Sequence, residues 1–172
     1  MWRAVNATIQ RMVKLGCEIG NHTWDHPEQT LPNMDLDSVM QEFQKTDDAL
    51  VKACGQASTV CRAPYGAITD EQMSAVGKPF FMWSTDSLDW KLMDADADYN
   101  QIMNDSSLGD GSIILMHDGY QTSVDAALKI ADLFTEKGYV LSLQTSSCSH
   151  KRFAFFLPDS LYCYTKLVQI SL

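Results

Sequence analysis

Residues 112–119, which read SIILMHDG, decide the fold class of this chain. Three large apolar residues in a row, Ile113 to Leu115, predict a strand that is buried on both faces, as in a parallel sheet. The residues that follow predict an amphipathic helix over 122–137 and a further strand over 139–143. A buried strand, a helix and a second strand in succession are typical of a parallel α/β fold.

The same alternation extends toward the N-terminus. Asp35 is a predicted helix N-cap, and residues 69–72 (TDEQ) have the form of a capping box. The predicted helices cover 3–15, 36–53, 69–77 and 97–107, and the predicted strands cover 17–20, 58–62 and 79–84. We therefore expect an α/β domain, a parallel sheet or barrel, over residues 1–144. Residues 145–172 fit no such unit and form a C-terminal tail of unknown structure.

The composition narrows the range of partners. In 172 residues, 13 Lys and Arg stand against 22 Asp and Glu, which gives a formal net charge of −9 and a pI near 4.7. Because an acidic surface repels phosphates, we expect no nucleic-acid partner and no anionic membrane partner. No apolar run reaches the roughly 18 residues of a membrane span, and the first residues lack the apolar region of a signal peptide. We expect a monomer.

The five cysteines form no CxxC pair, which argues against a zinc knuckle or a thioredoxin-like motif. Cys54 and Cys61 flank a short polar loop. They either pair in an oxidising compartment or serve as two small buried apolar residues.

Polar, chemically capable residues follow four of the predicted strands. These segments are NHTWDHP (21–27), RAPYG (62–66), TDSLDW (85–90) and HDG (117–119). In parallel α/β folds the ligand site lies at the carboxyl ends of the strands. The four segments therefore predict an enzyme, with His22, His26, Arg62, Asp86 and His117 in one pocket.

Each candidate side chain also has a simpler interpretation. His22 and His26 have a spacing that suits two ligands of Zn²⁺, but histidines in a solvated loop are common. Arg62 can orient a carboxylate or form an ordinary salt bridge. His117 follows an apolar strand and is either a general acid or a satisfied core histidine. Asp86 and Asp89 can cap the next helix, and Trp90 can belong to the core.

The segments HTWDH (22–26), RAPY (62–65), DSLDW (86–90) and LMHD (115–118), in this order, resemble the polysaccharide deacetylases. These proteins share the NodB-homology domain and form carbohydrate esterase family 4; the resemblance is greatest to bacterial peptidoglycan N-acetylglucosamine deacetylases. It covers residues 3–143 and implies a deformed or incomplete (β/α) barrel. It also implies an acetylated glycan as substrate and, for an intact family member, an extracellular or cell-wall location.

The resemblance assigns roles to individual residues. His22 and His26 match the two histidine ligands of a divalent metal, with Zn²⁺ the expected ion. Arg62 matches the arginine that holds the catalytic base. The other matches are the residue whose backbone N–H stabilises the oxyanion (Tyr65), the carboxylate that tunes the acid (Asp86, and by a weaker match Asp89), the lining of the acetyl and sugar pocket (Trp90 and Leu115) and the histidine that protonates the leaving amine (His117).

One family motif is missing. The family opens with a Thr-Phe-Asp-Asp type motif whose aspartates are the catalytic base and the third metal ligand, whereas residues 1–21 contain no aspartate. The chain is therefore expected to begin within the second or third helix of the family fold, without its first strand. We expect this polypeptide to bind metal poorly and to turn over slowly or not at all.

The implied reaction is metal-dependent removal of N-acetyl groups from GlcNAc-containing polysaccharide, either peptidoglycan or a chitin-like chain. A bound metal lowers the pKa of its water toward about 7 and polarises the amide carbonyl. One alternative is a catalytically inactive truncated remnant or glycan-binding module. Another is a related amidohydrolase of small amides.

Overall fold

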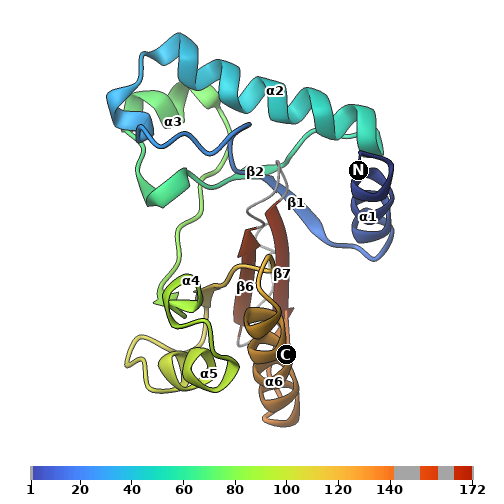
Figure 1. Cartoon of the computed structure of the whole chain (residues 1–172), viewed down its shortest axis with the longest axis vertical. Coiled ribbons are helices and arrows are strands. Elements are labelled where there is room, and N and C mark those ends of the chain that lie inside the picture. The colour runs from blue at the N-terminus through green and yellow to red at the C-terminus, as the bar shows by residue number, and fades with distance from the viewer. Residues whose placement is uncertain (1, 142–151, 159–164, 172) are drawn as a thin grey trace. The chain divides into compact units, whose positions relative to one another are not determined.

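The computed structural model describes residues 2–141, 152–158 and 165–171. They divide into two compact units: unit 1 contains residues 2–82 and Thr165, and unit 2 contains residues 83–141, 152–158 and 166–171. Helices alternate with strands in both units (Figure 1). The predicted α/β class is confirmed, and the described strands of neither unit close into a barrel. None of the described helices has the length and apolarity that a bilayer span requires.

Unit 1 contains three α-helices and a pair of parallel strands. The elements are α1 (Trp2–Lys14), β1 (Glu18–Asn21), η1 (Leu31–Asn33), α2 (Leu36–Cys54), β2 (Val60–Cys61), η2 (Pro64–Gly66) and α3 (Asp70–Val76). The register of β1 and β2 places Asn21 opposite Cys61. Because the two strands are parallel and end together, the residues that follow them start from the same edge.

Local capping explains where the helices of unit 1 begin and end. The Asp35 carboxylate accepts the N–H of Ser38 at the start of α2, and Gly55 ends that helix in the left-handed region. At α3 both hydrogen bonds of the predicted capping box, between Thr69 and Gln72, are present. The apolar face of α2 covers two buried clusters that include Leu31, Val39 and Phe43 in one and Ile9, Ile19 and Leu50 in the other.

Unit 2 is built on a run of parallel strands in the order β5-β6-β4-β3. Its elements are β3 (Thr85–Asp86), α4 (Asp89–Leu92), α5 (Ala95–Met103), β4 (Ser112–Leu115), α6 (Gln121–Glu136), β5 (Val140–Leu141), β6 (Arg152–Pro158) and β7 (Thr165–Ser171). Helices α5 and α6 pack on each other. Their core contains Ile102, Ile114, Ala126, Ile130 and Phe134.

The structure differs from the predicted elements in two places. The predicted strand over 79–84 reduces to one bridge between Phe80 and Cys61, and the strand that pairs with β4 is Thr85–Asp86. Pro79 explains the short pairing, since it accepts the N–H of Cys61 but has no N–H with which to extend the ladder. Within residues 145–172 the structure describes β6, which pairs with β4 and β5, and β7.

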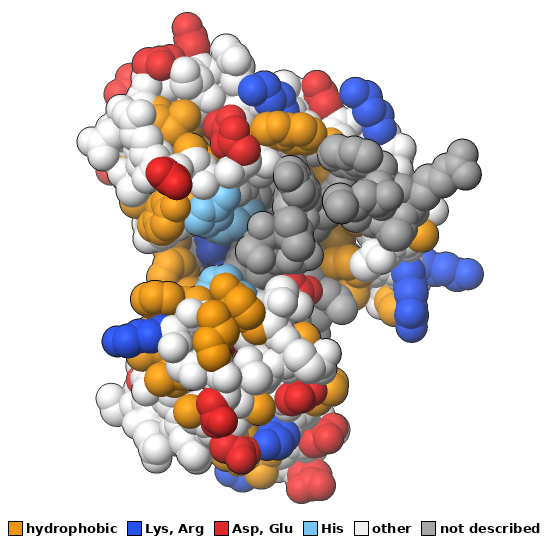
Figure 2. Space-filling view, viewed as in Figure 1, with side chains coloured by type: hydrophobic (Ala, Val, Ile, Leu, Met, Phe, Trp, Pro, Cys, Tyr) orange, Lys and Arg blue, Asp and Glu red, His pale blue; other side chains and the backbone are white. Residues whose placement is uncertain are grey.

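The acidic composition is reflected on the surface of the protein. Acidic side chains are spread over the face shown in Figure 2, consistent with the net charge of −9.

The thiols of Cys17, Cys54 and Cys61 are free, so Cys54 and Cys61 do not pair. Burial raises the pKa of the Cys61 thiol to about 12, as expected for an unreactive core residue. Cys148 and Cys163 lie outside the described residues.

Candidate functional site

The histidines of unit 1 lie in the loop that follows β1. The ring centroids of His22 and His26 are 5.1 Å apart, with an interplanar angle of 61°. Thr23 (φ 73°) and His26 (φ 49°) both adopt left-handed backbone conformations. Such conformations cost non-glycine residues about 1–3 kcal/mol and persist only where neighbouring groups hold them. The loop therefore has a fixed, non-helical shape that brings the two imidazoles together.

The geometry of this pair fits two of the ligands of a zinc ion. His22 Nδ1 lies 3.0 Å from the backbone oxygen of Arg62, which can only accept, so Nδ1 carries the proton and Nε2 is the ring nitrogen with the lone pair that a metal ligand needs. Tetrahedral Zn–N bonds of about 2.0–2.1 Å place the centres of two imidazoles about 5 Å apart. Among the described residues, however, no cluster of three His, Cys, Asp or Glu side chains is present. His22 and His26 would therefore provide two of the three protein ligands that a catalytic zinc site uses.

Arg62 and Tyr65 follow the end of β2 and lie in unit 1, as the two histidines do. Arg62 is 1% exposed and its Nε donates to the Phe81 carbonyl at 3.3 Å. Burial lowers the pKa of its guanidinium well below the ordinary value. Tyr65 has a left-handed backbone (φ 58°), and its ring meets that of His26 with centroids 4.7 Å apart. The tight turn over Pro64–Gly66 is what folds Tyr65 back toward His26.

In unit 2, His117 is held by a buried carboxylate. His117 Nδ1 lies 2.7 Å from Asp89 Oδ1, and the His117 backbone N–H donates to the other oxygen of the same side chain. The Trp90 N–H also donates to Asp89, at 2.8 Å. Burial by itself raises the pKa of Asp89, but the hydrogen bond and charge of His117 outweigh it, so the net shift is downward. Asp89 is therefore ionised and orients the imidazole.

The structure places Asp89 rather than Asp86, the stronger sequence match, on His117. Asp86 ends β3 opposite Leu115, and its Oδ1 accepts the N–H of Leu88 at 2.9 Å. His117 lies two residues beyond Leu115 along the chain. The carboxylate that contacts it is therefore that of Asp89, which lies beyond Asp86 in the turn at the start of α4. Asp86 shapes that turn, in which Leu88 is left-handed (φ 54°).

The two predicted pocket residues of unit 2 differ in exposure. Trp90 is 50% exposed on α4, whereas Leu115 is 7% exposed within β4. Trp90 is thus accessible to a ligand. The roles assigned to both, and the single pocket expected for the five candidate side chains, stay predictions.

Asp98 on α5 is a buried carboxylate that lies outside the predicted site residues. It is 0% exposed, and within the described part of the chain neither of its oxygens has a well-formed hydrogen bond. Burial, followed by the charges of Asp89 and Asp94, raises its pKa to about 6. A signal was present, because Asp98 precedes the buried Ile102 by four residues and so shares its helix face.

Replacing Asp98 with Asn is expected to change the pH dependence of stability. Because the folded state raises the pKa from 3.8 to about 6, the stability due to neutral Asp98 is full below 3.8 and is lost as the pH rises through about 6. Asp98→Asn cannot titrate. From about pH 4 to about pH 8, its free energy of unfolding should therefore rise relative to wild type by on the order of 2 kcal/mol.

Urea unfolding of both proteins across this pH range measures the effect. Asp96→Asn is the matched control, since Asp96 lies on the same helix and its side chain is 80% exposed beside Lys129. Parallel pH profiles for wild type and Asp98→Asn are the outcome that contradicts this prediction.

Comparisons with known proteins agree with these motifs. The family model for polysaccharide deacetylase matches residues 2–78. Peptidoglycan-N-acetylmuramic acid deacetylase PdaC of Bacillus subtilis is 38% identical over 134 residues, which is 78% of this chain and 28% of the relative. Peptidoglycan-N-acetylglucosamine deacetylase PgdA of Listeria monocytogenes is 30% identical over 131 residues, covering 76% of this chain and 27% of that protein.

A solved structure also resembles this chain in both sequence and fold. A deacetylase determined with its substrate is 32% identical and superimposes with a TM-score of 0.74, over 82% of this chain and 69% of that one. The chain spans about a quarter of the length of the two curated relatives, so the comparison concerns one part of those proteins.

Proposed function

Because the chain belongs to the polysaccharide deacetylase family, we propose that it provides the active-site residues of a metal-dependent hydrolase that removes N-acetyl groups from GlcNAc-containing polysaccharide. The observation that carries this proposal is the contact between His117 and Asp89. A histidine at the end of a parallel strand, backed by a buried and ionised carboxylate, is an arrangement suited to general acid catalysis. Peptidoglycan or a chitin-like chain is the proposed substrate.

His117 is the proposed general acid. Its Nδ1 faces Asp89, so Nε2, which faces away from the carboxylate, is the atom proposed to carry the proton for the leaving group. As the amide C–N bond breaks, Nε2 gives this proton to the departing amine nitrogen. Asp89 fixes the orientation of the ring and balances the charge of the imidazolium. The products are acetate and a free glucosamine unit.

His22 and His26 are the proposed metal ligands in unit 1, through nitrogens that include Nε2 of His22. If these residues hold Zn²⁺, the chemistry that the ion would supply is a bound water of lowered pKa and polarisation of the amide carbonyl. We assign stabilisation of the developing oxyanion to the Tyr65 backbone N–H, which the left-handed turn holds in a fixed orientation. The role proposed for Arg62 is to hold the catalytic base.

A general base and a third metal ligand are still required. Residues 1–21 contain no aspartate, and the described residues form no three-ligand cluster. We propose that a polypeptide of these 172 residues turns over slowly unless a segment bearing the Asp-Asp motif is supplied. The same observation favours a second candidate function, a catalytically inactive glycan-binding module.

Product analysis separates these functions. The chain is joined to a segment that carries the Asp-Asp motif and incubated with Zn²⁺. The substrate is either a GlcNAc oligomer or N-acetylglucosamine alone, and the masses of the products are measured by mass spectrometry. We expect the oligomer to lose acetyl groups while keeping its length. Binding of the oligomer without acetate release would favour the glycan-binding module, and release from the small amide alone would favour an amidohydrolase of small substrates.

The site of action and oligomeric state are part of the same proposal. The relatives are named for peptidoglycan, so we propose that the chain acts at the cell wall, and as a monomer. Size-exclusion chromatography with light scattering tests the second point directly.

A further inference from the structure

The two residues between His22 and His26 share one buried acceptor. The backbone N–H groups of Trp24 and Asp25 both donate to Oε2 of Glu42, at 3.0 and 3.2 Å. Glu42 belongs to α2 and is 6% exposed, so this carboxylate faces the loop and not solvent. Hydrogen bonds from N–H groups to a carboxylate are among the stronger ones in proteins.

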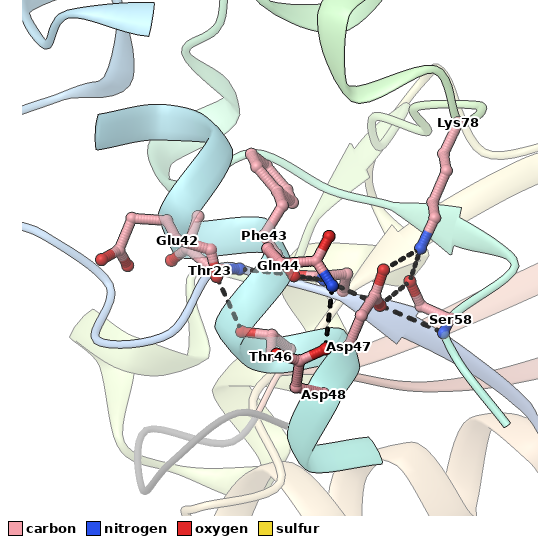
Figure 3. A network of polar contacts seen from close by, with 10 residues as sticks. Thr23, Glu42, Phe43, Gln44, Thr46, Asp47, Asp48, Ser58 and Lys78 are labelled. Atoms are coloured by element: carbon pink, nitrogen blue, oxygen red, sulfur yellow. Dashed lines mark hydrogen bonds and ion pairs between the residues drawn. The ribbon is translucent and has the colours of Figure 1, made fainter. Parts of the chain in front are cut away.

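The same helix also holds the start of this loop. The Asn21 side-chain oxygen accepts the N–H of Thr23 at 3.0 Å, while its Nδ2 donates to the Phe43 carbonyl and to Asp47. Asp47 in turn accepts from Ser58 and Lys78, as Figure 3 shows. The backbone N–H groups of residues 23, 24 and 25 are thus all bound by side chains that α2 provides or anchors.

These hydrogen bonds stabilise an otherwise unfavourable backbone conformation of the loop. Thr23 and His26 are in left-handed conformations, which are energetically unfavourable and persist only where other contacts hold the loop. The spacing of the two imidazoles depends on those same backbone angles. A carboxylate that binds the two peptide N–H groups between them restrains both at once.

We propose that Glu42 is a positioning residue that fixes the loop between His22 and His26 and thereby sets the spacing of the two imidazoles for a metal ion. Glu42 acts through the backbone N–H groups of Trp24 and Asp25. The proposal rests on the proposed function only for the metal. The restraint of the loop by Glu42 is independent of it.

Cobalt titration of the chain joined to a segment that carries the Asp-Asp motif tests the first half of this proposal. Glu42→Gln keeps an acceptor oxygen without the charge, and Glu42→Ala removes both. Asp48→Asn is the matched control, since it removes one charge from an exposed position of the same helix. Loss of a group that orients metal ligands typically weakens metal binding about 10–100-fold, and we expect this loss for Co²⁺ in Glu42→Ala, with Glu42→Gln within a few-fold of wild type and Asp48→Asn unchanged.

Amide hydrogen exchange tests the second half without metal. The Trp24 and Asp25 amides should exchange at least about tenfold faster in Glu42→Ala than in wild type, while amides in the middle of α2 keep their rates, because only the local restraint is lost. In Glu42→Gln the two amides should stay protected. This comparison also shows whether Glu42→Ala remains folded.

The outcomes separate the two proposals. Wild-type exchange rates at Trp24 and Asp25 in Glu42→Ala would overturn the positioning role, as would equal loss of Co²⁺ binding in Glu42→Gln and Glu42→Ala. Failure of the wild-type joined protein to bind Co²⁺, with the expected exchange rates, would instead contradict the metal part of the proposed function and leave the restraint by Glu42 established.

Discussion

Replacing His117 with Ala, in the chain joined to a segment that carries the Asp-Asp motif, is expected to lower kcat for acetate release by about 10²–10⁴-fold. The reason is that the variant has no group to protonate the departing amine, which is a poor leaving group without a proton. Zinc should stay bound at wild-type stoichiometry, because the proposed ligands His22 and His26 are untouched. Acetate release from a GlcNAc oligomer and zinc content of the purified variant measure the two quantities.

Two further variants identify the carboxylate that serves His117. Asp89→Asn removes the charge that faces His117 Nδ1, and should lower kcat strongly. Asp86→Asn alters a carboxylate that accepts the Leu88 N–H, and should cost much less. A larger loss in Asp86→Asn than in Asp89→Asn would contradict the assignment of Asp89, and normal turnover by His117→Ala would contradict the general-acid role itself.

Supplying the Asp-Asp motif is the second change with a large expected effect. We expect the polypeptide of 172 residues to release acetate at least about 10²-fold more slowly than the same chain joined to a segment that bears the motif, because general-base help alone is worth about 10²–10⁴-fold. Zinc affinity should rise in the joined protein, since a carboxylate adds a ligand and compensates charge.

The control for this experiment is the same joined protein with both motif aspartates changed to Asn. It separates the chemistry of the carboxylates from any effect of a longer chain. If the polypeptide of 172 residues already releases acetate at rates typical of enzymes, another residue supplies the missing groups. Asp25 and Asp118 are then the candidates, and the mechanism given above is wrong.

The sequence predicted the elements whose boundaries depend on local chemistry. Asp35 and Gly55 define α2, and the capping box at Thr69 defines α3, because these residues act on their own backbone neighbours. The strand around Phe80 was harder to place. Its apolar residues suggested a buried strand, but pairing depends on partners far along the chain and on the missing N–H of Pro79.

The sequence indicates which residues are candidates for the site but not which contacts they make. Spacing and order were enough to single out His22, His26 and His117. The choice between Asp86 and Asp89 depended on the register of β3 against β4, which the spacing of the segment 85–90 does not specify. The sequence does not mark Glu42 or Asp98, because a charged residue in a helix is usually exposed and only tertiary packing buries these two.

The most direct test of metal-dependent deacetylation is acetate release as a function of added Zn²⁺. The joined protein is stripped with a chelator and titrated with zinc in the presence of a GlcNAc oligomer, beside the same protein carrying His22→Ala. We predict that acetate release rises to a plateau near one equivalent of zinc in the first protein and stays at least about 10²-fold lower in the variant at the same zinc concentration. Acetate release that is independent of zinc, or equal in the two proteins, would contradict the account.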